Sequence, residues 1–297
     1  MIYFLQLIVT GVSIGCIYAL AALGFVLIYK ASRVINFAQG ELIAIGAFIV
    51  YGLTVWLGLP IWLSLIAGII LMFLVGRGIE RTFLRPMIGE PIISVIMVTI
   101  GMASLLSGLV FFTPFGTLTS RFPGYLPDTP LLFGGIVLRW EQLVGVILTL
   151  VFVSVLIFFF TRSTLGIAMR AVADDQLASL SLGVSVERVF GLAWAAAGMS
   201  ATAAGFVVGS LFGLELNSLT SIGLRVFPVV VLGGLDSIAG AVVGGVIIGV
   251  LEQLASGYLD AFVPGGGTGD VFPFLVLLVI LLVKPYGLFG TEEIERV

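Results

Sequence analysis

Charged residues are scarce in this sequence. Of 297 residues, 13 are Lys or Arg and 16 are Asp or Glu, which is 10% of the chain against about 25% in a typical soluble domain. Hydrophobic residues make up 60%, and the mean hydropathy is +1.26. One core cannot hide that much apolar surface, so much of it must face lipid. These proportions predict an integral membrane protein.

Histidine is absent, and cysteine occurs once, as Cys16. The first absence excludes a histidine base, a histidine metal ligand and a Ser-His-Asp triad. The second excludes disulfides within the chain and cysteine-ligated zinc. We therefore expect no catalytic residue, no metal and no cofactor, and the apolar segments show no paired acids that would suit an intramembrane enzyme. A formal net charge of -3 argues against a nucleic-acid partner.

A nucleotide-binding P-loop is also missing. That motif ends in Gly-Lys-Ser/Thr, whereas the two lysines, Lys30 and Lys284, are not preceded by glycine. Buried acids for proton coupling are few as well, with little beyond Glu41 and Glu252. Unless the chain is a passive channel, its energy must come from another polypeptide.

Apolar runs predict the fold. A membrane-crossing helix needs about 20 mostly apolar residues, and the opening MIYFLQLIV, without a basic region, is expected to belong to the first span rather than to a cleaved signal. We predict an all-α polytopic bundle of about eight or nine transmembrane helices, forming one domain over residues 1–297. The full spans lie near 5–29, 37–58, 61–76, 92–113, 141–161, 189–213 and 238–258, and shorter segments lie near 220–232 and 271–283.

The positive charges predict an orientation, because short cytoplasmic loops retain Lys and Arg. With the N-terminus outside and the C-terminus in the cytoplasm, ten basic residues are cytoplasmic and three lie at or near the outer face. The cytoplasmic set is Lys30, Arg33, Arg77, Arg81, Arg85, Arg162, Arg170, Arg188, Lys284 and Arg296, and the outer set is Arg121, Arg139 and Arg225.

The segment Thr220–Leu232 predicts a short, discontinuous helix. Its 13 residues, which include Arg225 and Pro228, extend only about 20 Å. Gly233 and Gly234 then predict a helix stop, and Asp236 or Ser237 an N-cap for the next span. Broken helices of this kind line transporter sites, although a connector packed inside the bundle explains the same pattern.

A polar segment at the predicted inner mouth offers further candidates. Asn36 and Gln39 have the spacing of a capping box, and Glu41 suits the first turn of a helix; the same side chains can instead meet a passing solute. Glu252, late in an apolar helix, either lines a pore or lies at the outer boundary. The candidate path residues are thus Asn36, Gln39, Glu41, Gly233, Gly234 and Asp236.

Glycine is abundant, with 39 residues, roughly twice the usual share. Pairs four apart, such as Gly11 with Gly15 and Gly245 with Gly249, place small residues on one helix face and predict close helix packing.

The loop from Arg162 to Arg188 is the longest cytoplasmic stretch and its centre is predicted to be helical. The spacing places four residues along one stripe of this helix: Ala171, Asp175, Ala178 and Leu182. Gly183 suits the end of the helix, and Ser185 can cap the next one. The pattern fits a docking element and a spacer equally well.

Four segments resemble the permease family of branched-chain amino-acid ABC importers, and the LivH type among its paired subunits. They are GVSIGCIYALAALGFVLIYKASRVINFAQGELIAIGAF, RAVADDQLASLSLGV, VVLGGLDSIAGAVVGGVIIGVLE and KPYGLFG. The resemblance covers nearly the whole chain. Members often carry His where Gln39 stands here, which weakens the case for solute contact at that position.

The resemblance implies a multi-pass protein of the bacterial inner membrane with several partners. These are a second permease of the LivM type, two cytoplasmic ABC ATPases and a periplasmic substrate-binding protein. It implies transport of a branched-chain or related neutral amino acid, with urea or short amides as the alternative cargo within the family and a passive channel as the alternative outside it. The family's ATPase-coupling helix maps to Arg170, Ala171, Asp174, Asp175, Ala178, Leu182 and Gly183.

Overall fold

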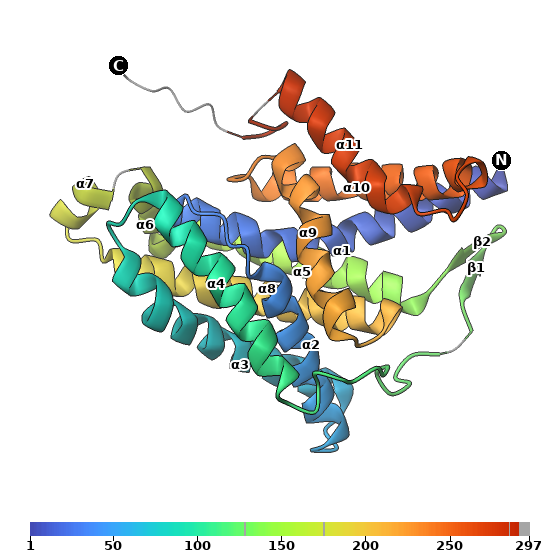
Figure 1. Ribbon diagram of the computed structural model, residues 1–297, viewed down its shortest axis with the longest axis horizontal. Coiled ribbons are helices and arrows are strands. Elements are labelled where there is room, and N and C mark those ends of the chain that lie inside the picture. The colour runs from blue at the N-terminus through green and yellow to red at the C-terminus, as the bar shows by residue number, and fades with distance from the viewer. Residues whose placement is uncertain (128, 175, 285, 291–297) are drawn as a thin grey trace.

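The computed structural model describes residues 1–127, 129–174, 176–284 and 286–290. Most of this chain is helical (Figure 1). The helices are α1 (Ile2–Ser32), α2 (Gln39–Val55), α3 (Ile61–Ile79), α4 (Ile92–Phe111), α5 (Trp140–Arg162), α6 (Thr164–Asp174), α7 (Gln176–Ser181), α8 (Val186–Phe212), α9 (Leu216–Gly233), α10 (Ile238–Leu259) and α11 (Thr268–Val283). Shorter turns are η1 (Glu80–Leu84), η2 (Arg85–Met87) and η3 (Asp260–Phe262), and the strands are β1 (Leu131–Phe133) and β2 (Ile136–Leu138).

All nine apolar segments are helices, which confirms the helical bundle. Within the described residues, seven helices are long and apolar enough to cross a membrane: α1, α3 with η1 and η2, α4, α5, α8, α9, and α10 with η3. The helices α2 and α11 are shorter, at 17 and 16 residues. Long apolar runs therefore located the helices correctly, since lipid-facing and core-facing positions alike must be hydrophobic.

The prediction for Thr220–Leu232 was wrong in length. The helix α9 begins at Leu216 and runs unbroken for 18 residues, with Pro228 inside it, and thus extends about 27 Å. Its end was predicted correctly, because α9 ends at Gly233 and Gly234 has a φ of 102°. Ser237, not Asp236, caps α10, since its hydroxyl accepts a hydrogen bond from the Gly240 amide at 2.9 Å.

The helix α1 forms the centre of the bundle, with α10 and α8 against it and α9 crossing it steeply (Figure 1). Glycine allows the closest of these contacts. A Cβ at Gly15 would lie 2.5 Å from the Gly245 carbonyl oxygen, and one at Gly249 would lie 2.5 Å from the Gly15 amide nitrogen. The four-residue glycine spacing therefore does what the sequence predicted, because the α1 and α10 backbones meet with no room for side chains.

The two ends of the bundle differ. At one end, the N-terminus lies near the antiparallel hairpin β1–β2, in which Leu131 pairs with Leu138 (Figure 1). At the other end lie α6 and α7. We call these the hairpin end and the α6 end. The hairpin was not predicted, although Gly134 and Gly135, with φ of 56° and 88°, form the two-residue glycine turn that favours such a hairpin.

Candidate functional site

The chain between α1 and α2 turns back into the bundle. Arg33 ends α1 with a φ of 56°, and its amide donates to the Tyr29 carbonyl at 2.8 Å. The Gln39 side chain then lies against Gly24, where any Cβ would overlap the Gln39 amide group. Gly24 is eight residues before the last residue of α1, about 12 Å along the helix. The helix α2 therefore begins well inside the bundle.

Asn36 stabilises this turn, although not as the predicted capping box. The N-cap of α2 is Ala38, which makes no side-chain cap. Asn36 instead accepts a hydrogen bond from the Ala38 amide at 3.0 Å and donates to the Gln39 Oε1 at 3.4 Å. Both side chains are fully buried, and the Gln39 Nε2 has no hydrogen-bond partner among the described residues. Asn36 therefore holds the backbone of the turn, and Gln39 packs beside it inside the bundle.

Glu41 lies in the first turn of α2 and faces a groove of about 650 Å³. We call this space the α2–α9 groove. The Glu41 carboxylate is half-buried and accepts a hydrogen bond from the Ser107 hydroxyl of α4 at 3.4 Å. The groove is lined by Phe25, Phe37, Gly40, Glu41, Ile100, Ala103, Ser104, Ser107, Asn217, Thr220, Ser221, Gly223, Leu224 and Phe227. A volume of this size suits a small-molecule site.

The walls of the groove combine one acid, several hydroxyls and aromatic rings. Phe37 and Phe227 stack with ring centroids 6.3 Å apart. On α9, the Thr220 and Ser221 hydroxyls donate to carbonyls of their own helix at 3.2 and 2.8 Å, which leaves their oxygen lone pairs available to accept. On α4, the Ser104 hydroxyl donates to the Ile100 carbonyl of its own helix at 3.5 Å. The bond from Ser107 to Glu41 was missed, because only the fold brings α2 and α4 together.

Close backbone contact holds α2 against α9 at this point. A Cβ at Gly223 would lie 2.8 Å from both the Cα and the nitrogen of Gly40, and a Cβ at Gly40 would overlap the Thr220 carbonyl oxygen. Neither position has room for a side chain. The crossing sets the distance between the two helices that form the walls of the groove.

The remaining predicted path residues lie elsewhere. Gly233 packs against Gly240 of α10, and Gly234 against Gly290. The final segment is bound to the end of α9 by hydrogen bonds from the amides of Leu288 and Phe289 to the carbonyls of Leu232 and Gly233, at 2.8 and 3.1 Å. At this end, the carbonyl of Asp236 accepts from the Lys30 ammonium at 2.9 Å. The structure therefore does not bring these glycines or Asp236 to the α2–α9 groove.

Glu252 faces protein and does not line the groove. It is 9% exposed and accepts a hydrogen bond from the Tyr18 hydroxyl at 3.0 Å. Nearby, Arg225 of α9 forms an ion pair with Asp270 of α11 at 2.7 Å. These contacts join α1, α9, α10 and α11 and do not line the groove.

The predicted coupling segment is helical on both sides of Asp175, which lies outside the described residues. Met169, Val172 and Ser179 are buried, whereas Arg170, Ala171, Ala178 and Leu182 are exposed. Asp174 is the last residue of α6. Gly183 ends the segment with a φ of 81°, and the Ser185 hydroxyl caps α8 by accepting from the Arg188 amide at 3.4 Å. The segment thus presents Arg170 together with small and apolar side chains outward at the α6 end.

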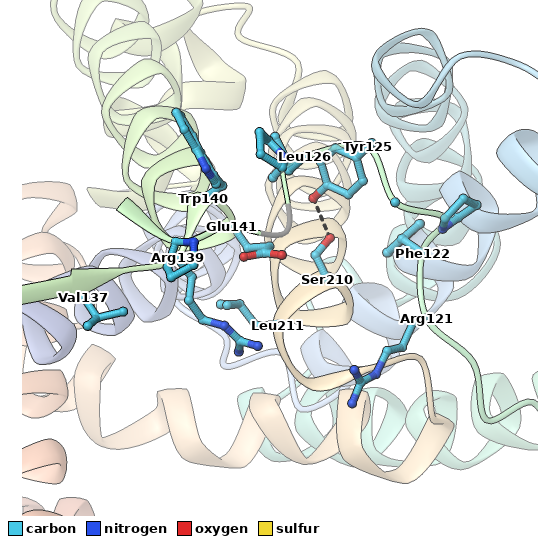
Figure 2. Close-up of a pocket in the computed structure, with 14 residues that line it drawn as sticks. Arg121, Phe122, Tyr125, Leu126, Val137, Arg139, Trp140, Glu141, Ser210 and Leu211 are labelled. Carbon is cyan, nitrogen blue, oxygen red and sulfur yellow. Dashed lines mark hydrogen bonds between the residues drawn. The ribbon is translucent and has the colours of Figure 1, made fainter. Parts of the chain in front are cut away.

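A second cavity, of about 610 Å³, opens at the hairpin end (Figure 2). It lies between the loop that follows α4, the first turn of α5 and the last turn of α8. Its wall includes Arg121, Arg139 and Glu141, together with Tyr125, whose hydroxyl donates to the Ser210 hydroxyl at 2.8 Å. The pattern of basic residues in the sequence predicts that Arg121 and Arg139 lie near the outer face, and only the fold brings them to one cavity.

Comparison with known proteins shows similarity along almost the whole chain. A family model described as "Branched-chain amino acid transport system / permease component" matches residues 7–283. The high-affinity branched-chain amino acid transport system permease proteins LivH of Salmonella typhimurium and of Escherichia coli are each 32% identical over 310 residues, which is 100% of this chain and 98% of theirs. The permease protein BraD of Pseudomonas aeruginosa is 32% identical over 309 residues, 99% of this chain and 98% of its own. No solved structure matches this chain.

Proposed function

This chain belongs to the family of permease components of branched-chain amino acid transport systems, and we propose that it provides the path along which a branched-chain or related neutral amino acid crosses the membrane. It is a membrane permease and not an enzyme. Because the sequence has no P-loop lysine, ATP must be hydrolysed by partner chains. We propose two ABC ATPases, a second permease of the LivM type and a periplasmic substrate-binding protein as these partners.

The distribution of positive charge supports an orientation with the N-terminus outside. The ion pair between Arg85 and Glu187, at 2.9 Å, places the loop after α3 beside the start of α8, at the α6 end. The basic residues of the α6 end are Lys30, Arg33, Arg77, Arg81, Arg85, Arg162, Arg170, Arg188 and Lys284, whereas Arg121 and Arg139 lie at the hairpin end. The positive-inside rule favours the α6 end as cytoplasmic.

The observation that carries the proposed path is the position of Glu41 in the α2–α9 groove. A neutral amino acid has an ammonium group, a carboxylate and an apolar side chain. Glu41 offers a negative partner for the ammonium, the hydroxyls of α9 offer polar contacts, and the stacked Phe37 and Phe227 offer an apolar surface. We infer that the second permease covers the open side of this groove and completes the path.

The exposed face of α6 and α7 is the proposed contact for the ATPases. Ala171 and Ala178 are small and Leu182 is 83% exposed, so this surface can enter a groove on a partner without steric obstruction. The buried Met169 and Val172 attach α6 to the bundle. Movement of this segment would then shift the equilibrium between outward-open and inward-open states by differential binding.

The test is uptake of radiolabelled L-leucine by vesicles that contain the complete transporter, with binding protein outside and ATP inside. The variant Glu41→Gln keeps the shape of the side chain and removes its charge, so we expect a loss of uptake of about tenfold or more. Glu90→Gln is the matched control, because Glu90 is exposed in the loop between α3 and α4. Equal uptake by both variants would contradict the role of Glu41.

The same vesicles separate the alternative cargoes and the alternative mechanism. Excess urea or acetamide should not compete with L-leucine. Flux through the permease alone, without ATP or partner chains, would indicate a passive channel and refute the proposed importer.

A further inference from the structure

The cavity at the hairpin end has a fixed framework. The Gln6 side chain of α1 bonds the backbone of Val137 twice, donating to its carbonyl at 2.8 Å and accepting from its amide at 2.7 Å. The Gln142 Oε1 accepts from the Arg139 amide at 3.1 Å, and the Trp140 indole donates to the Thr129 carbonyl at 3.0 Å. These bonds hold the backbone from β2 into α5, so Arg139 and Glu141 project from a rigid support.

The opposite wall of this cavity supplies neutral polar groups. The Tyr125 ring packs against Phe206, with centroids 5.3 Å apart, and its hydroxyl bonds Ser210. Burial raises the pKa of Tyr125 to about 12, and the charge of the nearby Glu141 acts in the same direction. Tyr125 therefore remains a neutral phenol at physiological pH and adds no charge to the cavity.

Three charged side chains share the cavity without neutralising one another. Across the described ranges, no ion pair joins Arg121, Arg139 or Glu141 to another side chain. Figure 2 shows the Glu141 carboxylate between the Arg139 side chain and the Tyr125–Ser210 pair, with Leu211 beside Arg139. A cation and an anion held apart in one cavity are complementary to a small molecule that carries both charges.

We propose that this cavity binds the free zwitterion of an α-amino acid, with the carboxylate on the Arg139 guanidinium and the ammonium group on the Glu141 carboxylate. Arg121 adds a second positive charge on the carboxylate side, and Leu126 and Leu211 line an apolar surface for the side chain. A volume of about 610 Å³ holds a molecule of this size with water. The amino acid binds in this cavity at the hairpin end before it enters the α2–α9 groove.

This assignment rests on the proposed function for the identity of the cargo, but not for the chemistry of the site. The charge pattern selects a zwitterion over a molecule with only one of the two charges. Each charge-assisted contact that is lost should weaken binding by about tenfold. Urea and short amides, which carry no ionised groups, should bind poorly.

The experiment uses the complete transporter in lipid nanodiscs, without the binding protein. Trp140 lines the cavity, so its fluorescence is titrated with L-leucine, with isocaproate, which lacks the ammonium group, and with isoamylamine, which lacks the carboxylate. We expect a response to L-leucine that Trp140→Phe removes, and binding of each single-charge analogue that is about tenfold weaker or less.

Variants then assign the two charges. Arg139→Gln and Glu141→Gln should each weaken L-leucine binding by about tenfold, and Arg139→Lys should restore part of it. The control Arg81→Gln removes an exposed positive charge at the α6 end and should leave binding unchanged. Arg139→Lys also serves if loss of the charge prevents assembly, since it retains the charge but not the bidentate geometry.

Two results would overturn the proposal. One is L-leucine affinity that is unchanged in both Arg139→Gln and Glu141→Gln. The other is a defect in these variants that affects only the affinity for the unliganded binding protein, which would make the cavity a protein-docking site. If ATP-driven L-leucine uptake persists in either case, the proposed function stands. Conversely, L-leucine binding by a complex that cannot transport L-leucine would refute the proposed cargo. The assignment of the cavity as a zwitterion site would still stand.

Discussion

The crossing of α2 and α9 makes a sharp prediction about stability. In Gly223→Ala, the new Cβ would lie 2.8 Å from two backbone atoms of Gly40. Carbon atoms pack at about 3.5 to 4.0 Å, so the helices must separate by roughly 1 Å. Neither contact atom belongs to a side chain that could rotate away. Forcing a methyl group into such a site costs about 1 to 3 kcal/mol of unfolding free energy.

The sign of the effect follows from a comparison with Gly101→Ala in α4. A Cβ at Gly101 would have no heavy atom within 4 Å, and alanine is the better helix former by up to about 1 kcal/mol. Gly101→Ala should therefore be neutral or stabilising, whereas Gly223→Ala should be destabilising. For a chain of this size, each kcal/mol corresponds to a Tm change of about 2 °C or less.

The assay is thermal unfolding of the purified permease in detergent, followed by tryptophan fluorescence. Gly40→Ala should resemble Gly223→Ala, since its Cβ would overlap the Thr220 carbonyl. The double variant should cost less than the sum of the two, because the first substitution already separates the helices. A Tm for Gly223→Ala at or above that of Gly101→Ala, or strict additivity of the two substitutions, would refute the close backbone contact.

Three further predictions concern other parts of the chain. Ala171→Trp, on the exposed face of α6, should reduce co-purification of the ATPases without lowering the Tm of the permease; the control is Leu132→Trp at the hairpin end, and equal co-purification would contradict the docking role. Asn36→Ala removes a buried partner from the Ala38 amide and should lower stability by about 1 to 3 kcal/mol, measured as a Tm decrease; an unchanged Tm would argue against the buried turn. Glu80→Ala removes one of the two acids that pair with the partly exposed Arg85 and should lower the free energy of unfolding by about 1 kcal/mol. A loss of several kcal/mol in the thermal unfolding assay would show that the Arg85–Glu80 pair is more deeply buried than the structure indicates.

Helix positions were predictable from the sequence because the chemical requirement is local. A helix in lipid must be apolar over most of its length whichever way it faces, so a run such as Ile92–Phe111 is visible without knowledge of its neighbours. Helix ends with local signals were predictable for the same reason, as Ser185, Ser237 and Gly234 show. The extent of α9 was not, because polar residues at its start, such as Asn217 and Ser218, do not continue the apolar pattern.

The candidate site was predictable only in part. Glu41 was identified as a path residue because an acid is rare in an apolar chain, and the structure places it in a groove. Asn36 and Gln39 were named with it, but they are buried in the turn. Gly233 and Gly234 end a helix as predicted and yet lie away from the groove. A residue type and its spacing indicate a local role, whereas the space that a side chain faces depends on distant segments.

The sequence by itself determined that this is a lipid-embedded helical permease that cannot bind ATP through a P-loop, and it located the segments that form the helices. These properties depend on composition and on short stretches of chain. Only the tertiary structure decided that α2 begins inside the bundle, that Ser107 meets Glu41, and that Arg139 and Glu141 share a cavity with Tyr125. Each of these arrangements brings together segments that are far apart in the chain, and it depends on how the helices and loops pack in three dimensions, which no single segment encodes.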